Sequence, residues 1–361
     1  MLISLQMMTH TIAQSTAKQG RVRVAVAGIS HGHAAWIFNR QDTSDMEIVG
    51  VYETDKVLIE KYRKDHKLAA SLFYDDLNKM LDELKPAGVV AFGSIYDHMK
   101  VVEAAAPRGI HVMVEKPLAT NIAHAFRMQA LVTQHNIHLL TNYETSWYPA
   151  TEKTYQLVHD SAFVGKLRKA VFHHGHQGPQ EIGVGKEFFE WLTDPVQNGG
   201  GALIDFGCYG ANIMTWLMKG KKPLSVTAVT QQYKPSIYPK VDDDATIIVD
   251  YGDAQAIIQA SWNWPYNRKD MEVYGDAGYV TTFDHSRMQT RKGNNEPRRF
   301  AVTTNDIKVY TDPFKYFSDV ITKRITVPSY GLYSLENNLL VVQILDAARE
   351  SARTGKKIEI K

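Results

Sequence analysis

The first 143 residues alternate between short apolar runs and longer amphipathic or charged stretches. Six apolar or β-branched runs predict strands at residues 21–27, 47–52, 72–74, 87–92, 111–114 and 137–140. The stretches between them predict helices at residues 34–40, 55–67, 75–84, 96–108 and 119–136. Strands that alternate with helices form a doubly wound parallel sheet. Because right-handed crossovers orient every strand alike, the carboxyl ends of the strands are expected at one rim.

The second half of the chain has a different pattern, in which strands follow one another with little helix between them. After a helix at residues 151–160 and a strand that begins at Gly165, five more strands are expected at residues 225–233, 245–251, 256–262, 271–274 and 279–283. Such a run predicts an antiparallel sheet. A final amphipathic helix at residues 335–354, ended by Gly355, is expected to pack back on one of the domains.

These patterns predict an α/β protein of two domains. Residues 21–143 form a doubly wound parallel domain, and residues 144–361 form an α+β domain with a mostly antiparallel, open sheet. The length of 361 residues and the 44% hydrophobic content suit two domains with sizeable cores.

Charge and cysteine content exclude several classes of protein. The net charge near +2 gives no electrostatic reason to expect nucleic acid or an anionic membrane as a partner. The single cysteine, Cys208, excludes an internal disulfide and a cysteine-rich metal site. No run of about 18 apolar residues is present, so no membrane span is expected.

Residues 1–20 are expected to be a leader, either a disordered extension or the remnant of an export signal. The run 2–13 is mildly apolar, and Ala13-Gln14-Ser15 resembles a cleavage region. No basic region precedes the run, however, and Gln6 and Thr9 interrupt it. A cytoplasmic protein is therefore expected, with an exported, periplasmic protein as the alternative.

A Gly-rich turn, Gly28-Ile29-Ser30-His31-Gly32-His33, follows the first strand at the place of a dinucleotide-binding turn. Only Gly28 matches that pattern, because Ser30 and His33 take the places of its second and third glycines. A helix N-terminus still favours an anion there, and Ser30 offers a hydroxyl and an N–H group. Glu53 ends the second strand about 25 residues later, near the spacing of a carboxylate that binds the adenosine ribose. That carboxylate would repel a 2′-phosphate, so NAD is favoured over NADP; the alternative is a solvated carboxylate at a helix entry.

The strand at residues 111–114 runs directly into Glu115-Lys116-Pro117. Open α/β sheets bind their ligands outside the carboxyl ends of the strands, which is where this ionisable pair stands. Pro117 restricts Lys116 to extended geometry, and either isomer of the bond between them fixes the direction of the ammonium group. The alternative is a strand end with a solvated lysine. We expect cofactor contacts from Gly28, Ser30, His31, Gly32, His33, Glu53, Ser94, His98, Glu115, Lys116 and Asn142.

A second motif begins at three glycines, 199–201, which open a helix expected to reach Leu217. Asp205, Tyr209 and Asn212 lie at i, i+4 and i+7 on one face of that helix. A carboxylate, a phenol and an amide aligned in this way suit a polyhydroxylated ligand, although a solvated face is an equally good interpretation.

Three near-adjacent histidines end the strand that begins at Gly165. His174 and His176 share one face of it, and His173 lies on the other. No neighbouring carboxylate completes a metal site, so no metal is expected, and the histidines are assigned to the substrate cleft or the surface. We expect substrate contacts from Lys116, Tyr143, His174, His176, Asp205, Tyr209 and Asn212.

Together these motifs resemble the Gfo/Idh/MocA oxidoreductases, which include glucose–fructose oxidoreductase and inositol dehydrogenase. The resemblance covers the chain from Arg21 onward and is most specific at residues 115–117 and 199–212. It implies an N-terminal Rossmann domain, NAD(P)-dependent chemistry on sugars or polyols, and a homo-dimer or homo-tetramer formed through the open sheet. The family's lysine falls on Lys116 and its helix aspartate on Asp205. Its usual histidine and following aspartate fall on Tyr209 and Asn212, as in the glucose–fructose oxidoreductase branch, where tyrosine is the proposed acid/base.

The expected reaction transfers a hydride between the nicotinamide and a sugar or polyol carbon. Lys116 is expected to lie beside Tyr209 and to lower the pKa of the phenol, so that Tyr209 acts as the base while Asp205 orients a neighbouring hydroxyl. One alternative is a redox-assisted glycoside-cleaving enzyme that recycles its NAD. The other is a non-enzymatic sensor of a dinucleotide or a sugar.

Overall fold

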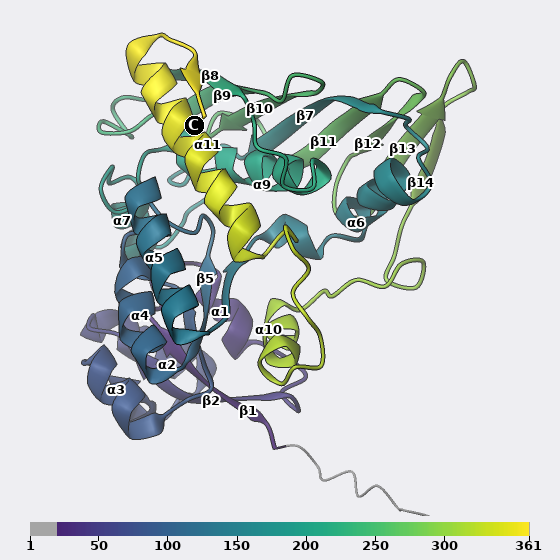
Figure 1. The fold of residues 1–361 in the computed structure, drawn as a ribbon. Coiled ribbons are helices and arrows are strands. Elements are labelled where there is room, and N and C mark those ends of the chain that lie inside the picture. Colours follow the sequence, from purple (N-terminus) through teal and green to yellow (C-terminus); the bar gives the residue numbers. More distant parts are fainter. Residues whose placement is uncertain (1–19, 361) are drawn as a thin grey trace, which may run out of the picture.

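The computed structural model describes residues 20–360, and Figure 1 shows their fold. The expected leader therefore lies, apart from Gly20, outside the described residues. Within residues 20–360 no helix combines the length and the apolar character needed to cross a membrane.

The N-terminal domain contains a six-stranded sheet in which every strand pair is parallel. The strand order is β3-β2-β1-β4-β5-β6, as in a doubly wound fold. Its strands are β1 (Val22–Ala27), β2 (Met46–Tyr52), β3 (Phe73–Tyr74), β4 (Gly88–Ala91), β5 (His111–Glu115) and β6 (Leu139–Asn142). Its helices are α1 (Ala34–Phe38), α2 (Lys56–His66), α3 (Leu77–Leu84), α4 (Asp97–Ala105) and α5 (Ile122–His135). The predicted fold of this half is confirmed, with element ends shifted by a few residues.

The C-terminal domain contains a nine-stranded sheet of order β14-β13-β12-β11-β7-β10-β9-β8-β15. Only β7 and β10 pair in parallel, so the prediction of a mostly antiparallel sheet is confirmed. Its strands are β7 (Leu167–Gly175), β8 (Ser225–Gln231), β9 (Asp244–Asp250), β10 (Gln255–Ser261), β11 (Arg268–Gly275), β12 (Gly278–Thr282), β13 (Arg287–Lys292), β14 (Arg298–Ala301) and β15 (Ile358–Glu359). The prediction missed β13, β14 and β15, because these are edge or near-edge strands with few buried side chains.

The helices of the second half are α6 (Pro149–Tyr155), α7 (Lys186–Leu192), α8 (Ala202–Asp205), α9 (Gly207–Leu217), α10 (Pro313–Ile321) and α11 (Leu335–Thr354). The prediction of a single helix from the three glycines to Leu217 was wrong, because Phe206 interrupts it and separates α8 from α9. Every residue of α9 except Trp216 is buried against the sheet and α11. The expectation for the final helix is confirmed: α11 packs on α9 and β8 and also on α5 of the first domain (Figure 1).

Helix α10 belongs to the core of the N-terminal domain, although its sequence position assigned it to the second. Phe314 and Phe317 are fully buried with Val24 and Phe92 of that domain. A side chain at Gly88 would meet the Phe317 ring at 2.9 Å, which shows how closely α10 approaches β4. The chain therefore returns to the first domain before α11. Hydrophobic periodicity predicts a helix but not the domain against which that helix packs.

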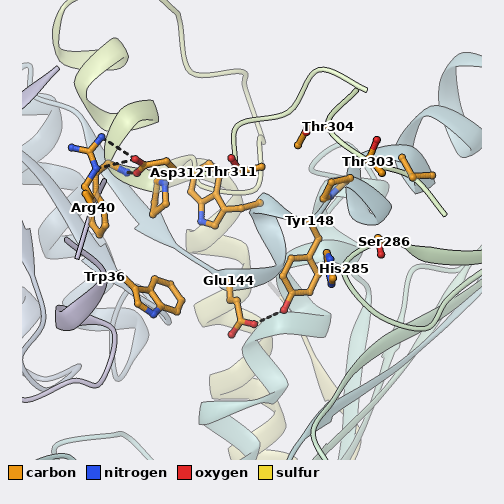
Figure 2. A pocket seen from close by; sticks show the side chains of 15 residues that line it. Trp36, Arg40, Glu144, Tyr148, His285, Ser286, Thr303, Thr304, Thr311 and Asp312 are labelled. Carbon is orange, nitrogen blue, oxygen red and sulfur yellow. Dashed lines mark hydrogen bonds and ion pairs between the residues drawn. The ribbon is translucent and has the colours of Figure 1, made fainter. Parts of the chain in front are cut away.

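The two domains enclose a cavity of about 630 Å³ (Figure 2). Trp36 and Arg40 reach it from the first domain, and Tyr148, His285 and other residues reach it from the second half of the chain. A smaller cavity of about 200 Å³ lies next to it, at the carboxyl end of β5.

Candidate active site

Lys116 and Asp205 come from different domains and meet in the wall of the smaller cavity. The ammonium group of Lys116 forms an ion pair with the Asp205 carboxylate and donates to the Asp205 carbonyl oxygen at 3.1 Å. Trp262 donates its indole N–H to the second carboxylate oxygen at 2.9 Å. Both charged side chains are almost completely buried. Burial alone would lower the pKa of Lys116 and raise that of Asp205, but their mutual attraction outweighs it, so both groups stay charged.

The glycine motif places Asp205 by bringing the start of α8 against another loop. The Asp242 carboxylate accepts the N–H of Gly201 at 3.0 Å and that of Leu203 at 2.7 Å, so it caps the start of α8. A Cβ atom on Gly201 would lie only 1.8 Å from the Asp242 carbonyl oxygen, so no larger residue fits. The carboxylate of Asp205 at the end of α8 is thereby held against Lys116. The bond between Lys116 and Pro117 is cis.

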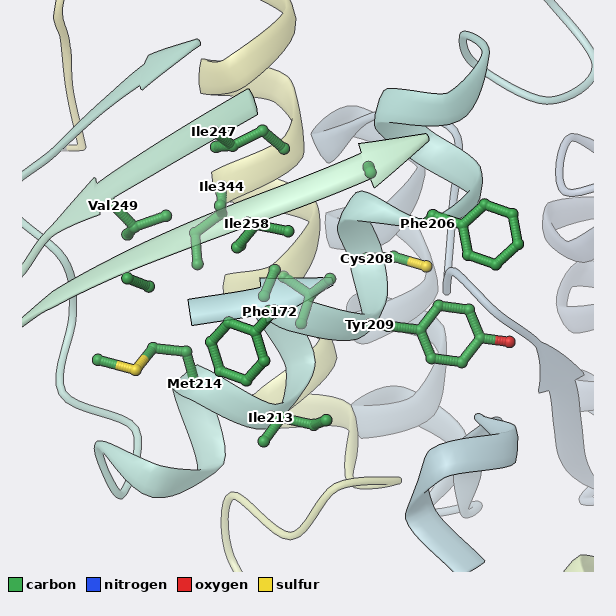
Figure 3. Close-up of a cluster of buried hydrophobic side chains, with 14 of the residues drawn as sticks. Phe172, Phe206, Cys208, Tyr209, Ile213, Met214, Ile247, Val249, Ile258 and Ile344 are labelled. Atoms are coloured by element: carbon green, nitrogen blue, oxygen red, sulfur yellow. The ribbon is translucent and has the colours of Figure 1, made fainter. Parts of the chain in front are cut away.

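Tyr209 lies on α9 beside this ion pair, with its ring 5.3 Å from the Lys116 ammonium nitrogen. Figure 3 shows its hydroxyl pointing away from the apolar cluster that holds Phe172 and Ile258. The expectation that Lys116 lowers the pKa of this phenol was wrong. Burial, followed by the charge of Glu144, raises the pKa of Tyr209 well above 10, while the charge of Lys116 is engaged by Asp205. The structure therefore favours the protonated phenol.

Glu115 is buried beside the Gly-rich turn and accepts hydrogen bonds from two side chains, one on each carboxylate oxygen. Nδ1 of His33 donates to Oε2 of Glu115 at 3.0 Å, and the Asn142 amide donates to Oε1 at 2.7 Å. Burial would raise the pKa of Glu115, but His33 outweighs it and lowers the value to about 2. The indole of Trp147 in turn fixes Asn142 at 2.8 Å. Glu115 and Asn142 thus position His33 and the turn.

The Gly-rich turn and the end of β2 have the features of a dinucleotide site. Gly28 has φ +76° and a Cβ there would lie 2.8 Å from the Gly93 nitrogen, so only glycine fits. A groove of about 320 Å³ runs past Gly28, Ser30, Glu53 and His98. Glu53 accepts the Ile29 N–H at 3.1 Å, which ties the turn to β2 and leaves the carboxylate at the edge of the groove.

Helix α7 crosses the turn from the second domain, which the sequence did not reveal. Trp191 donates to the Ser30 hydroxyl at 3.1 Å, and the Phe188 ring lies 4.5 Å from the ring of His31. His31 is buried, while Gly32 is exposed. These contacts close the turn on the side that faces the smaller cavity.

Two more residues that line the smaller cavity, His176 and Lys269, carry polar groups. His176 lines it, and its Nδ1 accepts the Gly178 N–H at 3.0 Å, so a neutral His176 carries its proton on Nε2. Burial lowers the pKa of His176 to about 4. Lys269 lines the cavity with its ammonium nitrogen 5.7 Å from the Tyr209 ring and forms an ion pair with Glu144. No motif identified Lys269 or Glu144, because they lie 125 positions apart and meet only in the fold.

Several predicted site residues lie behind the cavity. Tyr143 is fully buried, with its ring perpendicular to that of Tyr209 at 5.5 Å, and His174 is buried at 5.5 Å from the same ring. Ser94 is buried and donates to Asp97 at 2.8 Å, and His98 bonds to the Leu118 carbonyl at 3.2 Å. These residues support the walls of the site.

The assignment of Asn212 to the substrate was wrong. Its amide donates to the Leu332 carbonyl at 2.6 Å and to Asn338 at 3.3 Å, which ties α9 to the start of α11. Asn212 is fully buried between α9 and the segment before α11, whereas Tyr209, one turn earlier on α9, still lines the cavity with Asp205.

Within residues 20–360, one group of side chains has the spacing of a metal site: His31, His33 and Glu115. Nδ1 of His31 accepts the His33 N–H at 3.0 Å, so the neutral ring carries its proton on Nε2. A metal ion would have to displace that proton or the backbone N–H, and it would also have to break the bond between His33 and Glu115. The absence of a metal stays a prediction.

Acid should destabilise the protein because of the buried His98. Burial lowers its pKa from the ordinary 6.5 to about 4. As pH falls through 6.5 the unfolded chain takes up this proton first, so stability is full above 6.5 and declines down to about 4. The largest loss from this side chain is about 3 kcal/mol. Urea unfolding of His98→Asn between pH 7.5 and 4.5 should show a flatter pH dependence than the natural protein, whereas the partly exposed His135→Asn should not.

Comparison with known proteins places both domains. Residues 22–143 match the oxidoreductase family with an NAD-binding Rossmann fold, and residues 153–281 match the GFO/IDH/MocA C-terminal domain. The trans-1,2-dihydrobenzene-1,2-diol dehydrogenase of Xenopus laevis is 28% identical over 220 residues, which span 60% of this chain and 61% of that enzyme. The D-xylose 1-dehydrogenase [NADP(+)] of Haloarcula marismortui is 21% identical over 360 residues, or 96% of this chain and 95% of that one.

Solved structures share the fold. The aldose–aldose oxidoreductase of Caulobacter crescentus, complexed with glycerol, superposes with a TM-score of 0.77 at 20% identity, covering 94% of this chain and 99% of that one. An inositol dehydrogenase homologue of Azotobacter vinelandii, complexed with NAD+, gives 0.80 at 16% identity, covering 94% and 97%. Because the two family matches together span more than half of the chain, the protein belongs to the GFO/IDH/MocA family of oxidoreductases.

Proposed function

We propose that this protein is an NAD-dependent dehydrogenase that transfers a hydride between the nicotinamide and a hydroxyl or carbonyl carbon of a sugar or polyol. One observation carries the proposal. Lys116 from the first domain and Asp205 and Tyr209 from the second line a single cavity, at the carboxyl end of β5 and beside the Gly-rich turn. That is where a doubly wound sheet presents a nicotinamide to its substrate.

The residues along the groove fit a dinucleotide. Gly28 has a positive φ and no side chain, so the backbone of the turn can approach a pyrophosphate closely, and Glu53 lies on the same groove, where an adenosine ribose would bind. When bound, the nicotinamide supplies the hydride chemistry, and the protein supplies placement and proton transfer.

The proton chemistry follows from the charges at the cavity. Because burial keeps the Tyr209 phenol protonated, it donates its proton to a substrate carbonyl oxygen as that carbon receives the hydride. The ammonium groups of Lys116 and Lys269, 5.3 Å and 5.7 Å from the ring, reduce the cost of the phenolate that forms, although their pairing with Asp205 and Glu144 leaves burial as the larger effect on the pKa of Tyr209. In the oxidation direction the substrate hydroxyl returns its proton to the Tyr209 oxygen while its carbon gives up the hydride. The Asp205 carboxylate orients a neighbouring hydroxyl.

The test is a panel of aldoses, polyols and glycosides incubated with NAD, with NADH formation and products both measured. The expected result is NADH formed in proportion to the oxidised sugar. Sugar release without net NADH would instead identify redox-assisted glycoside cleavage with a recycled cofactor. Binding of NAD without turnover of any panel member would reject the dehydrogenase and favour a sensor.

Glu53 should set the preference for NAD. Its carboxylate would repel a 2′-phosphate, so Kd for NADP should exceed that for NAD by roughly tenfold or more. In Glu53→Gln, the loss of the charge should lower the ratio of Kd for NADP to Kd for NAD, mainly by tightening NADP binding. Titration by tryptophan fluorescence measures both constants. Glu60→Gln, an exposed change on α2, should leave the ratio as it is. An unaltered ratio in Glu53→Gln would remove Glu53 from the cofactor site.

A further inference from the structure

The cavity at Lys116 and Tyr209 is small for a ligand site. Its volume is about 200 Å³, whereas sites for small molecules are typically about 300–1,000 Å³. The adjacent cavity, at about 630 Å³, is within that range (Figure 2). The reaction proposed above does not use it. The larger cavity therefore offers room for a part of the substrate beyond the ring that reacts.

The larger cavity has aromatic walls that are already held in place. The Trp36 ring stacks on His33 at 3.6 Å, and the Tyr148 hydroxyl donates to Glu144. Figure 2 shows Glu144 between Trp36 and Tyr148, with His285 beside Tyr148. Rigid aromatic rings give contact area without much loss of side-chain entropy, and their faces accept the apolar C–H faces of a sugar ring.

The charged groups of this cavity are paired. Arg40 donates to Asp312 at 2.8 Å and to Asp45 at 2.9 Å, and Glu144 pairs with Lys269. A charged ligand would find no unpaired countercharge among these residues. Serine and threonine hydroxyls, including those of Ser286 and Thr304, add hydrogen-bonding groups to the wall. An uncharged ligand with hydroxyl groups suits this lining.

Two side-chain pairs separate the larger cavity from the smaller one. Glu144 lines the larger cavity and its partner Lys269 lines the smaller, and Trp36 and His33 divide in the same way. The Glu144 and Lys269 side chains are 29% and 25% exposed, so their ion pair is mostly buried but still reaches solvent. A ligand that spans both cavities would have to displace this pair.

We infer that the larger cavity is a second sugar subsite and that the substrate is a glycoside of at least two rings, whose reacting ring lies against Tyr209 and whose second ring lies between Trp36 and Tyr148. This inference names the substrate class of the function proposed above and rests on it. The Glu144–Lys269 pair lies at the junction of the two rings.

The experiment compares single-ring and two-ring ligands with matched variants of the full chain. The panel pairs glucose, xylose and N-acetylglucosamine with their β-1,4-linked disaccharides, in the presence of saturating NAD. Thr304→Trp and Ser286→Trp place a large ring in the larger cavity, and Asn295→Trp adds the same ring on an exposed turn away from it. Affinity is measured by tryptophan fluorescence and calorimetry, and turnover by kcat/KM.

The natural protein should prefer at least one disaccharide to its monosaccharide by roughly tenfold or more, the gain expected from aromatic packing of a second ring. Thr304→Trp and Ser286→Trp should abolish that preference while single-ring binding persists, and Asn295→Trp should keep it. Equal affinity for one and two rings, or a preference that survives both filling variants, would overturn the subsite while leaving the dehydrogenase intact. Binding of NAD without binding of any sugar would reject the proposed function and the subsite together.

Discussion

Replacing Tyr209 by phenylalanine should lower kcat by about 10²–10⁴ and leave the affinity for NAD unchanged, because positioned proton transfer is typically of that size. The ring of Tyr209 packs against Phe206, Tyr143 and His174, and phenylalanine keeps those contacts. Only the hydroxyl, which points away from the apolar cluster, is removed (Figure 3). Stopped-flow measurement of NADH with a substrate identified from the panel gives kcat, and fluorescence titration gives the cofactor affinity.

Tyr143→Phe is the matched control for this experiment. Tyr143 is also a buried tyrosine in contact with Tyr209, but it does not line the cavity. Its loss should change kcat by far less than the loss of the Tyr209 hydroxyl. Equal effects of the two substitutions would show that both act through packing, and unchanged turnover in Tyr209→Phe would remove its assigned role in proton transfer.

The first domain could be predicted from sequence because its signals are local. An apolar strand followed by a Gly-rich turn, or by Glu115 and Lys116, can be recognised as the strand end of a doubly wound sheet from a few consecutive residues. Parallel strands then bring such ends to one rim whatever the loop lengths. The resemblance of two short motifs added the expectation that Lys116 lies beside Tyr209, and its ammonium nitrogen is 5.3 Å from that ring; the ion pair with Asp205 was not predicted.

The rest of the site depends on contacts that have no local pattern. Helix α10 returns to the first domain, and Lys269 meets Glu144, through the path of the whole chain. Asn212 lies against the start of α11, which no local pattern places there. Trp262 is buried and donates to Asp205, a contact that joins residues 57 positions apart.

The prediction that Lys116 lowers the pKa of Tyr209 was wrong for a related reason. A neighbouring ammonium group lowers the pKa of a phenol less when a carboxylate engages its charge, as Asp205 does here. Sequence spacing shows which groups are neighbours but not how deeply they are buried, and burial decides the direction of the shift. The raised pKa of Tyr209 therefore favours the protonated phenol, the form from which the proposed function has it donate a proton.

Replacing Lys116 by methionine should abolish turnover and also destabilise the fold, for separable reasons. The change leaves the buried Asp205 carboxylate with Trp262 as its remaining side-chain donor. Removing one partner of a buried ion pair typically costs about 3–5 kcal/mol. In the double variant Lys116→Met/Asp205→Asn the uncompensated charge is gone, and the amide oxygen can still accept from Trp262. Most of that stability should therefore return.

Turnover should not return with stability. Hydride transfer would still lack the ammonium group beside the phenolate, so kcat of the double variant should stay lower by about 10²–10⁴. Urea unfolding and NADH formation are measured on four proteins, which form a double-mutant cycle: the natural protein, Lys116→Met, Asp205→Asn and the double variant. A double variant as unstable as Lys116→Met would mean that the two side chains are not energetically coupled. A double variant that regained activity would make Lys116 a purely structural residue. The proposed chemistry would then depend on another cation beside Tyr209, and Lys269 lies 5.7 Å from that ring.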